Sequence, residues 1–152
     1  MSGAGTHRIV IDEAPDADVR EAVLAPLRDY NRGQAGDGRH GRFALRLERD
    51  GETLEGGLFA SHGYDWCYVD LLVVPDALRG TGVGSELMAA AEEEARRRGC
   101  VGIWLTTFSF QAKPFYESLG FREFGRLDDH PVGHSCHYLH KRLDTPTVSK
   151  GD

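Results

Sequence analysis

The chain has 152 residues, about the length of one domain. Apolar residues make up 40% of it and charged residues 28%, a globular composition that excludes disorder over most of the chain. The net charge of −6 argues against binding to nucleic-acid phosphates, and no apolar run approaches the ~20 residues that span a bilayer. We therefore expect a single domain over residues 1–152, with loose ends at 1–6 and 145–152, and neither nucleic acid nor a membrane as a partner.

The first half of the chain is expected to contain one helix and four strands. Alternating apolar residues at 7–11 predict a first strand, and the apolar period that begins after Asp16 predicts a helix. Residues 31–41 contain four glycines and predict a loop. The other expected strands are 43–48, 54–60 and 66–74, and the first two of them are joined by a turn at Asp50-Gly51.

The second half predicts a strand–helix–strand unit followed by a short helix and two closing strands. The expected elements are a helix at 82–98, a strand at 101–106, a helix at 112–119, and strands at 121–126 and 136–141. Because residues 69–74 and 101–106 are apolar runs on either side of a helix, we expect them to be parallel neighbours. The fold class predicted is α/β, with a mixed, mostly antiparallel central sheet and helices on both faces.

A run of charges occupies the end of the helix at 82–98. Glutamates and arginines stand four residues apart in three pairs, Glu92–Arg96, Glu93–Arg97 and Glu94–Arg98. Such pairs stabilise a helix by a few tenths of a kcal/mol each. We interpret this run as a solvated helix face without a function.

The three cysteines, Cys67, Cys100 and Cys136, are widely spaced and form no CxxC motif. They are typical of reduced intracellular thiols. Residues 1–6 contain no apolar segment that could act as a signal. A cytoplasmic location is the resulting expectation.

A glycine-rich loop, Arg79-Gly80-Thr81-Gly82-Val83-Gly84, separates the strand at 66–74 from the helix at 82–98. Glycines let the backbone N–H groups converge, and the helix N-terminus adds a positive dipole end, so a pyrophosphate would fit there. The sequence lacks the Gly-Lys-Ser/Thr of a Walker loop, and the third glycine of a dinucleotide fingerprint is replaced by Ser85. A strand-to-helix turn without a ligand is the alternative.

Two motifs in the expected order resemble the GNAT superfamily of acyl-CoA-dependent N-acyltransferases. The first is Leu72-x-Val74-x(4)-Arg79-Gly80-x-Gly82-x-Gly84, and the second is Ala112-x-x-Phe115-Tyr116-x-x-Leu119-Gly120-Phe121. The resemblance is strong over residues 66–126 and weaker elsewhere. It implies acetyl-CoA as co-substrate, bound in a gap between the two parallel strands; we expect no metal.

The resemblance also assigns roles to individual residues. The backbone of Leu72, Val73 and Val74 would bind the pantetheine arm. Arg79 and the backbone of Gly80, Thr81, Gly82, Val83, Gly84 and Ser85 would hold the pyrophosphate. Ser109 stands where the family often has asparagine, and a serine can still bond the pantetheine through its single hydroxyl. Tyr116 takes the position of the general acid, although a tyrosine beside Phe115 can also be a packing residue.

Asp70 is the candidate general base. It stands in an otherwise apolar run, two positions before Leu72, and we expect both side chains on one side of the strand. A carboxylate in such a strand either accepts a structural hydrogen bond or removes a proton, directly or through water. The sequence leaves both roles open.

Residues 128–134 are the candidate acceptor loop. Asp128, Asp129 and His134 stand in an irregular connection between the last two strands, and the resemblance places it beside the mouth of the acyl site. Carboxylates there would attract a cationic amine, whereas the alternative is an ordinary solvated turn. A metal site is disfavoured because His137 and His140 should point to opposite faces of a strand.

The function predicted is transfer of an acetyl group from acetyl-CoA to the amine of a small molecule by direct attack. Two alternatives stay open, a peptide or protein N-acetyltransferase and a non-catalytic acyl-CoA sensor. A homodimer is possible. The sequence does not identify the acceptor.

Overall fold

The structure is a computed structural model that describes residues 5–143. It divides into two compact units, residues 1–37 and 38–152, which we describe separately. The expected loose end at 145–152 lies outside the described residues, as do residues 1–4. The prediction of a single domain stays a prediction.

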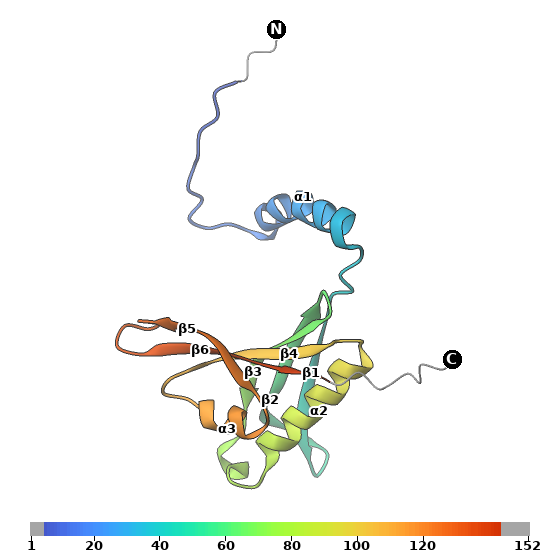
Figure 1. Ribbon diagram of the computed structural model, residues 1–152, viewed down its shortest axis with the longest axis vertical. Helices are drawn as coiled ribbons and strands as arrows, with labels where there is room; N and C mark the ends of the chain where they lie inside the picture. Colours follow the sequence, from blue (N-terminus) through green and yellow to red (C-terminus); the bar gives the residue numbers. More distant parts are fainter. Residues whose placement is uncertain (1–4, 144–152) are drawn as a thin grey trace, which may run out of the picture. The chain divides into compact units, whose positions relative to one another are not determined.

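The first unit contains one helix, α1 (Ala17–Ala35), shown in blue in Figure 1. It begins where the sequence predicts, because the Asp16 carboxylate accepts a hydrogen bond from the N–H of Val19 (3.0 Å). It continues to Ala35, so the loop predicted from residue 31 is partly helical. The strand predicted at 7–11 is wrong, since these residues form no regular structure and the sheet begins only at Gly41.

Residues 38–143 form a six-stranded sheet with two helices and one short 3₁₀ turn. The elements are β1 (Gly41–Arg49), β2 (Glu52–Gly63), β3 (Trp66–Val73), η1 (Asp76–Leu78), α2 (Val83–Arg97), β4 (Gly102–Phe108), α3 (Lys113–Ser118), β5 (Arg122–Asp128) and β6 (Ser135–Arg142). The strand order is β1-β2-β3-β4-β6-β5, and only β3 and β4 are parallel. The mixed, mostly antiparallel sheet with a parallel pair is confirmed.

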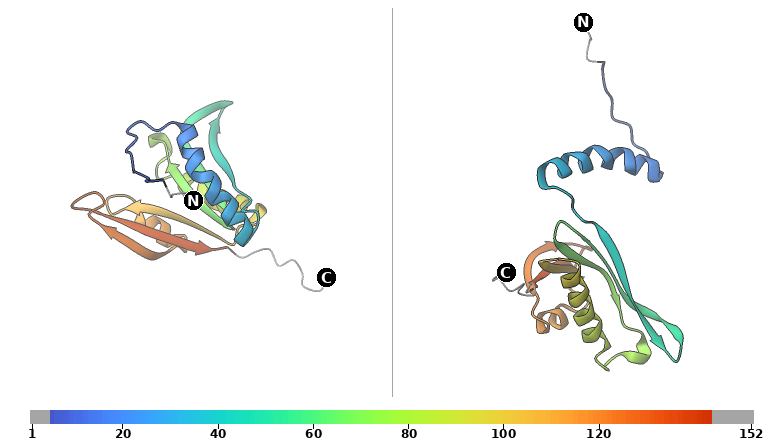
Figure 2. Two further views of the ribbon diagram at one scale, coloured as in Figure 1. Left: turned by 90° about the horizontal axis from the view of Figure 1, so that it is seen from above. Right: turned by 90° about the vertical axis from the view of Figure 1, so that its right-hand side faces the viewer.

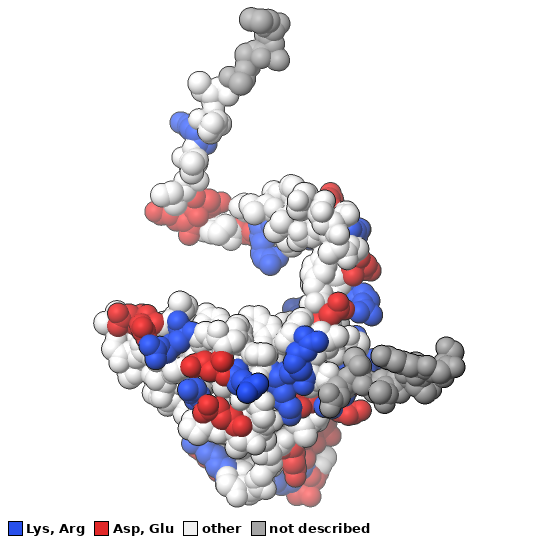
Figure 3. All heavy atoms as spheres, viewed as in Figure 1, with Lys and Arg blue, Asp and Glu red and all other residues white. Residues whose placement is uncertain are grey.

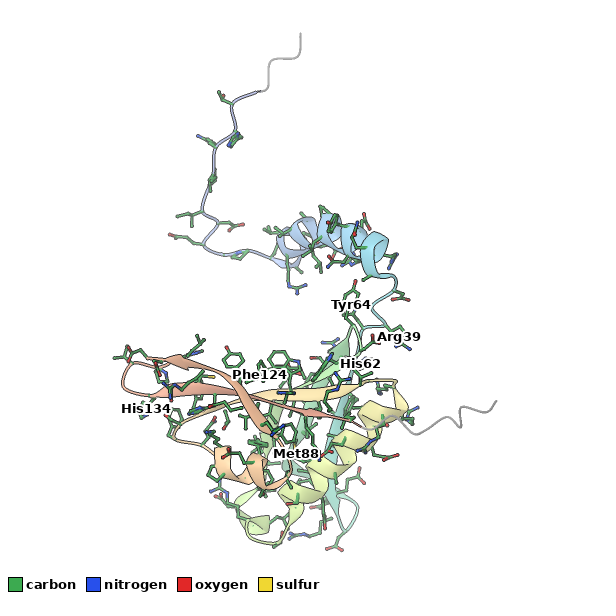
Figure 4. The ribbon with its side chains drawn as sticks, viewed as in Figure 1. Arg39, His62, Tyr64, Met88, Phe124 and His134 are labelled. Carbon is green, nitrogen blue, oxygen red and sulfur yellow. The ribbon has the colours of Figure 1, made fainter. Side chains whose placement is uncertain are left out.

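Both α2 and α3 pack on one face of this sheet (Figure 2). Strand residues that point to that face are buried, among them Ile103 and Leu105 of β4 and Leu139 of β6. Met88 of α2 is also fully buried, whereas Phe124 of β5 lies on the other face and is 54% exposed (Figure 4). The core therefore lies between the sheet and its two helices.

A bulge in β3 changes which side chains point to the core. Ala60 pairs with Val69, and Leu58 pairs with Leu72, so Asp70 and Leu71 together oppose a single residue of β2. The alternation of side chains is shifted at this point. The bulge lies directly before the residues that the resemblance assigns to the pantetheine arm.

Candidate active site

The two parallel strands separate along their length. Only three residue pairs join them, and the last is Tyr68 with Trp104. Beyond it, residues 69–73 of β3 and 105–108 of β4 have no register with each other. The hydroxyls of Tyr68 and Thr106 meet at 3.5 Å where the separation begins. The backbone groups facing this wedge are free to bond an extended ligand, as an added strand would.

The glycine loop leads from β3 to the N-terminus of α2. Gly80 and Gly82 have positive φ angles of 75° and 88°, a conformation in which most other residues are strained. A Cβ at either position would meet no atom within 4 Å, so the space beside them is open. At Gly84 a Cβ would lie 3.3 Å from the Phe115 ring, so the first turn of α2 packs closely against α3 at this position.

Helix α2 begins with unsatisfied donors. Its N-cap is Gly82, whose lack of a side chain leaves the first N–H groups of the helix without a side-chain acceptor. These donors and the positive end of a 15-residue helix favour an anion. The Arg79 guanidinium lies at the loop and pairs with Asp76 at 3.3 Å, with both side chains exposed.

A groove of about 390 Å³ joins the two sequence motifs. The candidate residues that line it are Leu72, Val74, Arg79, Gly80, Gly82, Val83, Gly84, Ser85 and Tyr116. Ala112, Phe115 and Leu78 complete the wall. Residues 72–85 and 112–116 therefore form one site, whose wall includes both the glycine loop and Tyr116.

Tyr116 is half-buried, with its ring against those of Phe115 and Phe121 (centroids 5.1 and 6.0 Å apart). Burial raises the pKa of its phenol above the ordinary value of 10.0. The phenol therefore stays protonated at neutral pH and is available as a hydrogen-bond donor in the wall of the groove. The packing role and the acid role are compatible in this position.

Residues 7–121 match a family model described as the acetyltransferase (GNAT) family. The chain belongs to the GNAT family of acetyltransferases. Acetyltransferase Atu2258 of Agrobacterium fabrum is 37% identical over 134 residues, which cover 88% of this chain and 98% of the relative. The blasticidin-S acetyltransferase of Streptomyces morookaense is 43% identical over 91 residues, 59% of this chain and 67% of the relative.

A solved acetyltransferase from Agrobacterium tumefaciens confirms the fold of this GNAT chain. It superposes with a TM-score of 0.82 at 36% identity, covering 90% of this chain and 99% of that one. The resemblance inferred from the two motifs is therefore correct, and so is the fold class. The chain is an acetyltransferase.

The structure corrects the expected side of Asp70. The Tyr68 ring contacts the Trp104 ring at a tilt of 44° on the sheet face away from α2 and α3, and Asp70, two residues on, follows Tyr68 to that face. Leu72 lies on the other side of the strand and lines the groove. The two side chains differ because the bulge adds one residue to β3 at this point, which shifts the alternation of side chains after Asp70. The expectation that Asp70 and Leu72 share a side is wrong.

Ser109 and Ser135 hold the end of β4 against the start of β6. The Ser109 hydroxyl accepts a hydrogen bond from the N–H of Ser135 (3.1 Å), and the N–H of Ser109 donates to the carbonyl of Ser135 (2.8 Å). The hydroxyl proton of Ser109 remains available for a second bond. Its side chain therefore combines a structural role with the predicted one.

The candidate acceptor loop is an ordered turn. Asp128 pairs with Arg126 (2.9 Å), and Asp129, at a positive φ of 57°, accepts a hydrogen bond from the N–H of Gly133 (3.3 Å). His134 lies edge-on to Phe110 with centroids 4.9 Å apart. Acidic and basic atoms meet at this tip of the β5–β6 hairpin in Figure 3, so the charge of Asp128 is partly balanced.

The histidines of β6 do not converge. The Nδ1 of His137 contacts Glu123 of β5, whereas His140 packs on the opposite side of the strand against Phe124 (5.1 Å). Within residues 5–143 no group of three His, Cys, Asp or Glu side chains is placed to hold a metal ion. In the same part of the chain, no helix has both the length and the apolar character needed to cross a bilayer.

All three cysteines are free and buried. Burial raises the pKa of Cys67 to about 12 and also raises the pKa of Cys100. Neither thiol forms the thiolate that a nucleophile needs near neutral pH.

Sequence reasoning missed two features of unit 38–152. One is a pocket of about 540 Å³ on the sheet face away from α2 and α3, which we call the aromatic pocket; it is lined by Trp66, Trp104, Phe124, Tyr138 and His140. The other is the ion pair of Glu92 with Lys141 (2.7 Å), because Glu92 was assigned to a solvated helix face and is only 7% exposed. Of the three expected pairs, Glu92–Arg96 and Glu94–Arg98 form at 3.9 and 2.8 Å, while Arg97 bonds to Glu94.

Proposed function

We propose that this acetyltransferase uses acetyl-CoA to acetylate the amine of a small molecule by direct attack. The observation that carries the proposal is the groove, which joins the anion-binding loop, the open wedge between β3 and β4, and Tyr116. The blasticidin-S acetyltransferase, similar over 59% of the chain, supports a small-molecule acceptor.

The groove fits each part of coenzyme A. The N–H groups from Gly80 to Ser85, with Arg79 beside them, would hold the pyrophosphate at the start of α2. The backbone of Leu72, Val73 and Val74 would bond the pantetheine arm in the wedge, with Ser109 on its other side. The acyl end would then lie near Tyr116.

The transfer step needs three groups of the protein. The amine nitrogen attacks the thioester carbonyl carbon, the new C–N bond forms, and the C–S bond breaks. The N–H of Val74 would stabilise the negative charge on the carbonyl oxygen. Tyr116 would donate to the leaving sulfur, and Asp70, on the opposite face, would take the ammonium proton, directly or through water.

We propose that Asp128, Asp129 and His134 contact the acceptor. The loop lies beside the end of β4, and acidic groups there favour a cation. The test is Asp129→Asn and His134→Ala, each assayed at varied amine and varied acetyl-CoA. The proposal requires a raised KM for the amine alone, and wild-type values of all parameters would remove the loop from the site.

A panel of amines tests the proposed function as a whole. We expect stoichiometric release of free CoA with at least one amine among aminonucleosides, aminoglycosides, amino acids and polyamines, with the N-acetyl product confirmed by mass. Turnover only with peptides would favour the protein N-acetyltransferase. Saturable acetyl-CoA binding without release on any panel would favour the sensor.

Two further expectations stay proposals. A cytoplasmic location is supported by the three free cysteines. A homodimer is possible, and light scattering of the purified protein would decide it.

A further inference from the structure

Helix α3, which carries Tyr116, is too short to hold itself in place. It has six residues, and its N-cap, Ala112, makes no side-chain cap for the first N–H groups. An isolated helix of this length is unstable in water, because nucleation fixes several residues for each hydrogen bond gained. The position of Tyr116 therefore depends on contacts from the rest of the fold.

The end of α3 that follows Tyr116 is held from β6 and from the start of β5. Lys141 donates to the carbonyl of Leu119 (2.8 Å). The carbonyl of Tyr116 accepts a hydrogen bond from the N–H of Phe121 (3.1 Å), the residue before β5. One end of the helix is thus fixed by named contacts.

Thr107 of β4 holds the start of α3. Its hydroxyl oxygen accepts a hydrogen bond from the N–H of Ala112 (3.4 Å). The carbonyl of Ala112 in turn accepts from the N–H of Tyr116 (3.3 Å). Thr107 is itself fixed, because it lies opposite His137 in the ladder of β4 and β6. Two hydrogen bonds therefore lead from the sheet to the backbone of Tyr116.

The side chain of Gln111 orients the Thr107 hydroxyl. Its Oε1 accepts a hydrogen bond from the N–H of Phe108 (2.7 Å) and one from the Thr107 hydroxyl (3.5 Å). A backbone N–H can only donate, so the amide atom that faces it must be the oxygen. Because the hydroxyl has a single proton, and that proton points to Gln111, its lone pairs are left for the N–H of Ala112.

The Thr107 hydroxyl is buried without a gain in stability that would explain it. Thr107 is 3% exposed, and within residues 5–143 it and Glu92 are the buried polar or charged residues. Burying a hydroxyl costs free energy, and hydrogen bonds of 3.4 and 3.5 Å offset that cost only in part. A valine would fill the same space without the cost. The direction that the hydroxyl gives to Ala112 is the better explanation.

We propose that Thr107 is a positioning residue for acetyl transfer, whose hydroxyl sets the start of α3 and so the place of the Tyr116 phenol in the groove. This inference rests on the proposed function, in which Tyr116 donates to the leaving sulfur. Ala112 and Tyr116 both line the groove. The glycine loop is a separate segment of the groove wall, so the rate of transfer should depend on Thr107 more than the affinity for acetyl-CoA does.

A matched pair of variants measures this difference. Thr107→Val removes the hydroxyl at nearly constant size, and Thr107→Ser keeps it. With an amine that the panel identifies, we expect Thr107→Val to lower the single-turnover rate of transfer by about tenfold, since a ~1 Å displacement of a reacting group costs up to about a hundredfold. Thr107→Ser should keep most of the rate. The Kd for acetyl-CoA should change by less than about twofold in both variants.

A double-substitution cycle with Tyr116→Phe tests whether Thr107 acts through the phenol. If it does, the loss caused by Thr107→Val disappears once the phenol is absent, and the double variant transfers at the rate of Tyr116→Phe alone. A similar loss in both backgrounds would overturn the proposal. A wild-type rate in Thr107→Val, or a rate in Thr107→Ser as low as in Thr107→Val, would overturn it as well.

Hydrogen exchange measures the anchoring of α3 without turnover. The amides of Ala112 and Tyr116 should exchange about tenfold faster in Thr107→Val than in wild type, because local opening of α3 is then easier. The control is the amide of Cys100, which is bonded to the carbonyl of Ala95 (2.9 Å) beyond the other end of α2. An equal acceleration at Cys100 would show general destabilisation and overturn the assignment.

The outcomes separate this inference from the proposed function. Unchanged exchange at Ala112 and Tyr116 overturns the anchoring even if amines are acetylated. Faster exchange at both amides, in a protein that acetylates no amine, would leave the anchoring by Thr107 assigned and the proposed function wrong.

Discussion

Replacing Lys141 by methionine should destabilise the protein through the buried carboxylate that it neutralises. The Lys141 ammonium lies 2.7 Å from Glu92 of α2 and donates to the carbonyl of Leu119 (2.8 Å) at the end of α3. The Glu92 side chain is only 9% exposed. Removing one partner of a buried pair typically costs about 3–5 kcal/mol, because the other charge stays buried without compensation.

The structure places the loss at the lower end of that range. Arg96 still lies 3.9 Å from Glu92 and balances part of its charge. We therefore expect Lys141→Met to lower the free energy of unfolding by about 3 kcal/mol. At ~2–4 °C per kcal/mol for a chain of this size, Tm should fall by roughly 6–12 °C.

Urea unfolding of a double-mutant cycle measures this coupling. The variants are Lys141→Met, Glu92→Met and the double substitution, and the double variant should be more stable than Lys141→Met because no charge is left buried. Lys141→Arg is the control, since it keeps the charge. If the two single losses simply add, within ~0.5 kcal/mol, the pair is not coupled and the reasoning is refuted.

Three further predictions concern the groove. Gly82→Asp should abolish the rise in Tm caused by acetyl-CoA, because a carboxylate at the start of α2 repels the pyrophosphate. The control is Gly51→Asp, at a similar φ of 82° in open space, which should keep the rise. An equal loss of the rise in both variants would point to general damage. Tyr116→Phe should lower kcat by about tenfold to a hundredfold and leave the KM for acetyl-CoA unchanged. Pre-steady-state kinetics measures the rate of the transfer step itself, and an unchanged rate of that step would remove the phenol from the mechanism. Burial raises the pKa of Tyr116 in the folded state. The stability that the buried phenol contributes is therefore complete below pH 10.0 and is lost as the pH rises through the folded-state pKa. Tm measured between about pH 9 and 11 should accordingly fall less in Tyr116→Phe than in wild type.

The groove could be predicted from sequence because its signals are local. The glycines of the loop, the apolar strand before it and the helix after it are neighbours in the chain, and the second motif has its own spacing. Gly80 and Gly82 adopt the positive φ angles that such a loop requires. The same local signals placed the Asp16 cap and the turn at Asp50-Gly51.

Features that depend on pairing between distant strands could not be predicted in the same way. The side of Asp70 depends on a bulge that is visible only once β3 is paired with β2. The strand expected at 7–11 has the right alternation, but alternation alone supplies no partner for its backbone. Lys141 and Glu92 are 49 positions apart, and no local pattern joins them.

The aromatic pocket left only a weak trace in the sequence. Trp66 with Tyr68, and Tyr138 with His140, repeat at two residues, which places each pair on one face of its strand. The two pairs lie on the same face of the sheet because of the register between strands. Tyr68 of β3 opposes Trp104 of β4, which in turn opposes His140 of β6. Sequence order alone does not contain that register.

A single-turnover reaction tests the central claim most directly. Excess enzyme is mixed with acetyl-CoA that contains a ¹³C-labelled acetyl group and with an amine that the panel identifies, and both product and intact protein are followed by mass spectrometry from the first milliseconds. Direct attack predicts that labelled N-acetyl amine and free CoA form at one rate, while the mass of the protein stays unchanged. A labelled acetyl-protein that forms before the product and decays into it would contradict the account, because the transfer would then pass through a nucleophile of the chain.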